Sequence, residues 1–129
     1  MAVIHERDLE RGRESFNRWR TLAETDEKAS TSLGRSTLAM AVRYSLHLLE
    51  TKAPGGAVEI RVAPWGAVKI LDGPRSDPHN LTPPDVVELD PTTWLRLASG
   101  MTSWDEERRR GTISSVGERD DLSALLPLV

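Results

Sequence analysis

The sequence predicts an α+β domain, in which a mixed β-sheet is covered on one face by helices. Two observations carry this prediction. Helical and strand-like periodicities do not alternate along the chain, as they would in a doubly wound α/β protein, and two helical segments precede a hairpin and a mixture of short elements. A length of 129 residues suits one domain. The absence of cysteine excludes disulfides, thiolate nucleophiles and cysteine-ligated metal sites.

The first predicted helix covers residues 5–24 and is amphipathic. Its apolar stripe is thin, and the charge pairs on its other face add only about a few tenths of a kcal/mol each. We therefore expect this helix to lie on another surface. The stripe consists of Leu9, Phe16, Trp19 and Ala23.

A second helix is predicted from a cap at Thr31 or Ser32 to about Lys52, where "APGG" ends it. Residues 57–70 then predict a β-hairpin, because apolar residues alternate with charged ones on both sides of a Pro-Trp-Gly turn. One face of the hairpin is therefore apolar. The apolar face of the helix is Leu38, Val42, Leu46 and Leu49, and that of the hairpin is Val58, Ile60, Val62, Val68 and Ile70.

The second half of the chain predicts two short strands, "DVVELD" and "TISSV", after an irregular proline-rich loop over residues 72–84. The final "DLSALLPLV" is predicted as a short apolar helix or an extended tail.

Two short helices are predicted between these strands. Asp90, followed by a proline, is a strong helix start, and Gly100 suits the left-handed residue that ends a helix. Ser103 with Glu106 has the spacing of a capping box, which predicts a second helix ending at Gly111.

No catalytic or metal site is indicated. His5, His47 and His79 lie in three separate segments, and we expect His47 at the edge of the core and the other two in solvent. The run from Asp105 to Arg110 places three acids before three arginines, which complements the helix dipole and predicts a solvated helix. A nucleophile elbow and a phosphate-binding loop are both missing.

Charge and hydropathy limit the classes of partner that the protein is expected to bind. The net charge is −3 and aromatic residues make up 5%, whereas nucleic-acid binders carry a strong basic stripe, so nucleic acid is not expected. No uncharged run exceeds eight residues, far short of the roughly twenty that cross a bilayer. With no apolar secretory signal at the N-terminus, we expect a cytoplasmic protein.

Two tryptophans flank the predicted corner between the last two helices. Trp94 falls in the first turns of one helix and Trp104 at the start of the next. Such rings pack helices together or form the wall of an apolar pocket. Spacing alone does not choose between these roles.

Three stretches, "GAVEIRVAPWGAVKILDGP", "TPPDVVELDPTTWLRLASGMTSW" and "GTISSVGERDDLSALLPL", resemble the bacterial branch of the sterol carrier protein type 2 family. The resemblance covers about residues 31–128. It implies a five-stranded sheet covered on one face by helices and a hydrophobic tunnel between the two layers. It also implies non-catalytic transfer of a sterol, fatty acid or acyl chain, with no cofactor. The loop "SDPHNLTPP" departs from the family, and "LPLV" lacks its peroxisomal address.

We therefore expect an amphipathic helix and polar linker over residues 1–30 and a sterol-carrier-like domain over residues 31–129, in a single compact unit. The predicted ligand is an apolar small molecule or lipid. The candidate lining residues are Val58, Ile60, Val62, Val68, Ile70, Trp94, Leu97, Trp104, Leu122, Leu125 and Leu126.

An alternative hypothesis is an interaction module with a closed core. It would dock on a protein partner, or form a homodimer, through Leu9, Phe16 and Trp19. A thiol-dependent isomerase, the third hypothesis, is disfavoured because the sequence lacks clustered histidines.

Overall fold

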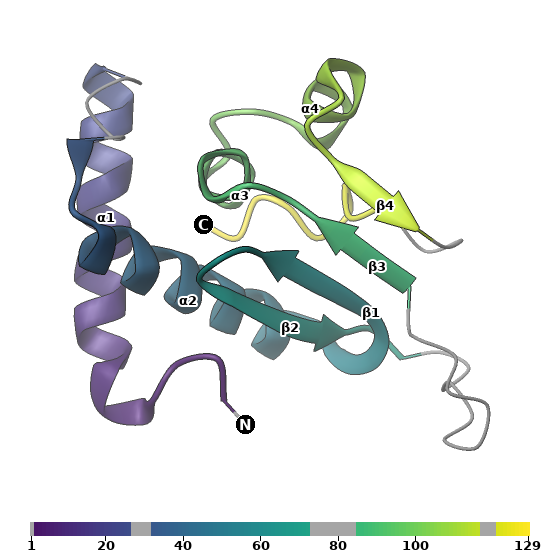
Figure 1. Cartoon of the computed structure of the whole chain (residues 1–129), viewed down its shortest axis with the longest axis horizontal. Helices are drawn as coiled ribbons and strands as arrows, with labels where there is room; N and C mark the ends of the chain where they lie inside the picture. Colours follow the sequence, from purple (N-terminus) through teal and green to yellow (C-terminus); the bar gives the residue numbers. More distant parts are fainter. Residues whose placement is uncertain (1, 27–31, 73–84, 117–120) are drawn as a thin grey trace.

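The computed structural model describes residues 2–26, 32–72, 85–116 and 121–129. A mixed sheet lies in front of one long helix, and a second long helix crosses the first (Figure 1). In chain order the elements are η1 (Glu6–Asp8), α1 (Leu9–Thr25), α2 (Arg35–Lys52), β1 (Pro54–Val62), β2 (Gly66–Ile70), β3 (Asp85–Glu88), α3 (Pro91–Ser99), α4 (Trp104–Arg110) and β4 (Ser114–Val116).

The sheet has the strand order β2-β1-β3-β4. β1 is antiparallel to β2 and parallel to β3, and β3 is antiparallel to β4, so the predicted α+β class with a mixed sheet is confirmed. Ile60 lies opposite Val68 on one side and Val87 on the other, which places all three side chains on the same face. This inner face is buried, while the outer face carries charged residues such as Glu88.

The expectation of five strands is corrected to four within the described residues. Those four are the strands that residue alternation predicts, whereas the fifth came from the family resemblance alone. The described segments offer no further run of alternating apolar residues that could extend either edge of the sheet.

Helix α2 packs on the inner face of β1 and β2, and α1 packs across α2 (Figure 1). The crossing depends on Gly12, because a Cβ atom there would lie 2.8 Å from both Ile4 Cδ1 and Tyr44 Cβ. Phe16 and Trp19 are each only 1% exposed. The predicted apolar stripe of α1 is therefore covered by its own chain, with Leu9 half-buried at its start.

The predicted boundaries of α3 and α4 are confirmed. The Asp90 carboxylate accepts a hydrogen bond from Thr93 N at 2.8 Å, and Gly100 ends α3 in the left-handed conformation with φ 82°. Ser103 Oγ accepts from Glu106 N at 3.1 Å, and Gly111 ends α4 in the same way.

The start of α2 differs from the prediction. The helix begins at Arg35, and Gly34 holds its N-cap position in an extended conformation without a side-chain hydrogen bond. Ser32 precedes the cap by two residues, and Thr31 is outside the described residues. A hydroxyl residue just before an apolar run marks a helix start only approximately, because neighbouring positions compete for the cap.

Candidate ligand-binding site

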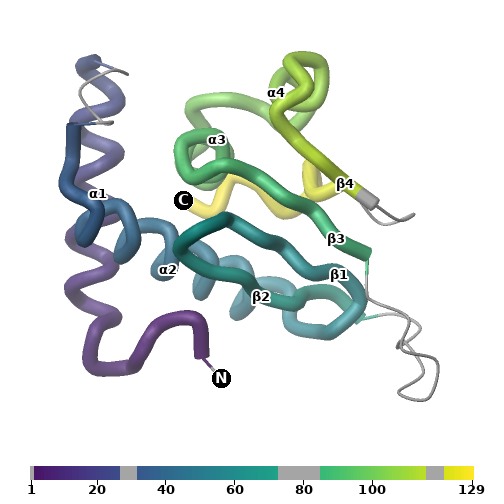
Figure 2. The backbone as a smooth tube through the Cα atoms, viewed as in Figure 1, coloured from purple at the N-terminus to yellow at the C-terminus, as the bar shows by residue number. Residues whose placement is uncertain are grey.

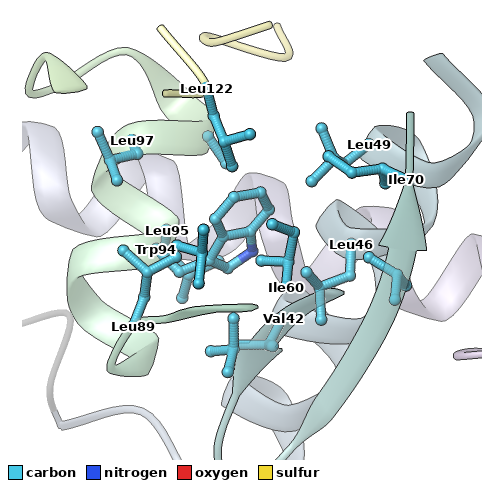
Figure 3. Close-up of a cluster of buried hydrophobic side chains, with 14 of the residues drawn as sticks. Val42, Leu46, Leu49, Ile60, Ile70, Leu89, Trp94, Leu95, Leu97 and Leu122 are labelled. Carbon is cyan, nitrogen blue, oxygen red and sulfur yellow. The ribbon is translucent and has the colours of Figure 1, made fainter. Parts of the chain in front are cut away.

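Most of the predicted lining residues come together in one buried cluster between the sheet and the helices. The ring of Trp94 lies near its centre, with Leu122 on one side and residues of α2 on the other (Figure 3). Leu125 and Leu126, in the C-terminal tail, are half-buried at the edge of this cluster. Nine of the predicted lining residues are no more than 4% exposed: Val58, Ile60, Val62, Val68, Ile70, Trp94, Leu97, Trp104 and Leu122.

Trp94 is a fully satisfied core residue. Its Nε1 donates a hydrogen bond of 2.8 Å to Ser45 Oγ, and the Ser45 hydroxyl in turn lies 2.8 Å from the carbonyl oxygen of Ala41. Both Trp94 and Ser45 are 0% exposed. This contact ties α3 to the middle of α2, 49 residues away in sequence.

An open groove with a volume of about 340 Å³ lies at the corner between α3 and α4, next to the C-terminal tail. It joins two candidates from the sequence, Trp104 and Leu126, with Met101, which the sequence did not single out. Its polar lining includes the exposed carboxylates of Asp105 and Glu106. The groove is therefore amphipathic, with an apolar wall and an acidic margin.

Trp104 differs from Trp94 in one respect. It is 3% exposed, yet its Nε1–H has no hydrogen-bond acceptor among the described residues. A buried donor without a partner costs about 1–3 kcal/mol.

The prediction that all six charges of α4 are solvated is wrong for Glu107, which is 1% exposed. Its carboxylate accepts hydrogen bonds from Thr112 at 2.8 Å and Thr102 at 3.2 Å. The Nη1 of Arg110 lies 3.4 Å from this carboxylate, and the Nη2 of Arg96 lies 3.7 Å from it.

The inward position of Glu107 has a helical cause. It follows the buried Trp104 by three residues, so both side chains lie on the same face of α4. That spacing was the signal by which the sequence could have identified it. Glu107 connects α3, the corner and the segment that leads into β4.

The C-terminal tail closes this side of the molecule. Leu128 N donates to Ala98 O at 2.9 Å, and Lys52 Nζ donates to Leu125 O at 2.8 Å. Leu122 is 0% exposed and anchors the tail in the core. The groove wall formed by the tail is thus attached to both α2 and α3.

Among the described residues, no group of three or more histidines and carboxylates could hold a metal ion. His47 is half-buried and His5 exposed, as expected, whereas His79 is outside the described residues. No helix in the described segments is long and apolar enough to cross a membrane.

Residues 34–128 match the model of a protein family described as bacterial SCP ortholog. The match begins at the N-cap of α2 and includes the sheet, the corner groove and most of the tail. No curated protein matches the chain.

Proposed function

Because the chain belongs to the bacterial SCP ortholog family, we propose that it binds and transfers a lipid or another apolar molecule without catalysing a reaction. The family is the bacterial branch of the sterol carriers that the sequence resembles. Membership supports an apolar ligand.

The corner groove is the observation that carries this proposal. Its volume of about 340 Å³ falls within the range of about 300–1,000 Å³ that is typical of ligand pockets. Its apolar wall, formed by Met101, Trp104 and Leu126, continues into the buried cluster beneath the tail. We propose that an apolar chain inserts here and displaces the half-buried leucines of the tail.

The residues around the groove indicate which polar group the ligand carries. Trp104 Nε1 is buried, and we propose that displacement of the tail leucines opens it to an oxygen acceptor on the ligand. Asp105 and Glu106 are exposed at the same margin and would repel a carboxylate. An uncharged oxygen, as in an alcohol or ester, therefore fits better than a free fatty acid.

Native mass spectrometry of protein purified without detergent, followed by organic extraction, tests the proposal. We expect the purified protein to carry bound lipid. We also expect an added fluorescent long-chain alcohol to compete with that lipid for binding. Replacing Leu126 by arginine should weaken binding at least about tenfold, because a charge would then be buried in the apolar wall. Ala124→Arg, at an exposed position of the same tail, is the matched control.

Two outcomes would overturn the proposal. The first is a protein that carries no lipid and binds no apolar probe. The second is probe binding that Leu126→Arg and Ala124→Arg weaken equally, because the groove would then have no special part in it.

The alternative of docking through α1 has less support. It requires an exposed apolar stripe, but Phe16 and Trp19 are each 1% exposed and packed within their own chain. Deleting residues 1–28 would uncover the α1-facing side of α2, including Tyr44. An association state changed by that deletion would therefore not demonstrate a natural interface.

A further inference from the structure

The tip of the β1–β2 hairpin is a short apolar turn, in which Trp65 packs against the core. Ala63 and Pro64 are exposed, and Trp65 is half-buried. The tip lies beside the first half of α2, whereas α4 lies on the far side of the sheet, next to β4 (Figure 2). It is therefore separate from the corner groove.

Two arginines contact Trp65, and a third contacts the start of α2 beside them. The guanidinium carbon of Arg35 lies 5.9 Å from the centre of the Trp65 ring, and Arg43 Nε donates to Trp65 O at 3.0 Å. Arg11, on α1, donates to Ser36 Oγ at 2.7 Å, one residue after Arg35. We call Trp65, Arg11, Arg35 and Arg43 the tip cluster.

The acids of α2 and the hairpin lie away from Arg35. Residues 31–71 contain two acids, Glu50 and Glu59. Glu50 lies fifteen residues along α2 from Arg35 and seven from Arg43, roughly 22 Å and 10 Å at the rise of an α-helix. Glu59 is paired with Arg61 at 2.8 Å. On α1, Glu10 is paired with Arg13, and Asp8 and Glu14 each lie three residues from Arg11, so the positive charge of the cluster rests mainly on Arg35 and Arg43.

We propose that the tip cluster docks the protein on an anionic lipid surface. Tryptophan favours the boundary between apolar chains and headgroups, because its ring is apolar and its N–H is polar. Arginine forms strong, directed hydrogen bonds to phosphate oxygens. This inference concerns where the protein docks, beyond what it carries.

Cosedimentation of the full chain with vesicles tests the docking. We expect binding to vesicles of phosphatidylglycerol and phosphatidylcholine, weaker binding at high salt, and little binding to phosphatidylcholine alone. Arg35→Glu should lower the affinity for anionic vesicles at least about tenfold, since each basic side chain near such a surface contributes appreciably. Arg35 is the first residue of α2, where an acid is favourable to the helix, so this variant should stay folded.

Arg109→Glu, an equal change of charge on α4, is the control and should bind as the unchanged protein does. A second measurement uses tryptophan quenching by lipids brominated in their acyl chains, made in a Trp104→Phe background so that a lipid bound in the corner groove does not contribute. We expect this quenching to be lost when Trp65→Phe is added. Four results would overturn the proposal: no binding to anionic vesicles, binding unaffected by lipid charge, equal losses in Arg35→Glu and Arg109→Glu, or quenching that persists without Trp65.

Discussion

Trp94 and Trp104 lie ten residues apart, and both are buried, but the structure treats their indole N–H groups differently. Trp94 sits in the core and donates to Ser45 at 2.8 Å. Trp104 lines the corner groove, and its Nε1 has no acceptor among the described residues. Most buried donors in native proteins are satisfied, so Trp104 is the exception of the two. The comparison contrasts a buried donor that supports the fold with one that adds a cost.

The largest expected effect comes from Glu107, which stabilises the corner beside the unsatisfied indole. Glu107→Ala should lower the free energy of unfolding by about 3 kcal/mol, because it removes two hydrogen bonds to a buried carboxylate, from Thr102 and Thr112, and hydrogen bonds to charged groups contribute about 1.5–3 kcal/mol each. Chemical denaturation measures this. Glu106→Ala, at the exposed neighbouring position, should cost under about 1 kcal/mol. Equal losses in the two variants would contradict the structural role of Glu107.

A smaller effect is expected in the core. Ser45→Ala would leave the Trp94 donor without its acceptor and should cost about 1–3 kcal/mol. The same substitution should cost less in a Trp94→Phe background, where no donor remains, and this coupling is measured by a double-mutant cycle. Thr21→Ala, which removes a similar hydroxyl bond on the exposed face of α1, is the control. Additive effects of Ser45→Ala and Trp94→Phe would contradict a direct bond.

Local patterns predicted much of the fold. The alternation in residues 57–70 gave the hairpin and its buried face, and the caps at Asp90 and Ser103 gave the starts of α3 and α4. Each of these depends on residues close together in sequence. The four-strand order could not be obtained in this way, because the parallel pairing of β1 with β3 is a long-range contact.

The site was harder to predict for the same reason. Both tryptophans were identified as candidates, but their roles depend on partners elsewhere in the chain. Ser45 meets Trp94 only because α2 packs beneath α3. The groove exists only because the tail returns past the corner, where a Cβ atom on Gly100 would lie 3.3 Å from Pro127.

Trp104→Phe gives the sharpest contrast with the core. Removing an unsatisfied donor offsets the loss of ring volume, so the free energy of unfolding should stay constant or rise by up to about 1 kcal/mol. Trp94→Phe should instead lower it. If the proposed ligand contact is present, Trp104→Phe should weaken binding of a long-chain alcohol and leave binding of the alkane of equal length unchanged. Equal destabilisation in the two variants would contradict the contrast between the tryptophans.

The smallest expected effect concerns the tail, which forms one wall of the groove. Ser123 N donates to the Asp121 carboxylate at 2.9 Å, and this hydrogen bond, with that of the Ser123 hydroxyl, holds the pKa of Asp121 below its usual value. A lowered pKa in the folded state stabilises the protein above the unfolded-state pKa of about 4, and the effect is lost as the pH falls through the folded-state pKa. Because Asp121 is exposed, the effect should be well under 1 kcal/mol. The difference in melting temperature between the unchanged protein and Asp121→Ala should therefore be small at neutral pH and should shrink below about pH 4. A difference that grows on acidification would show that this carboxylate does not anchor the tail.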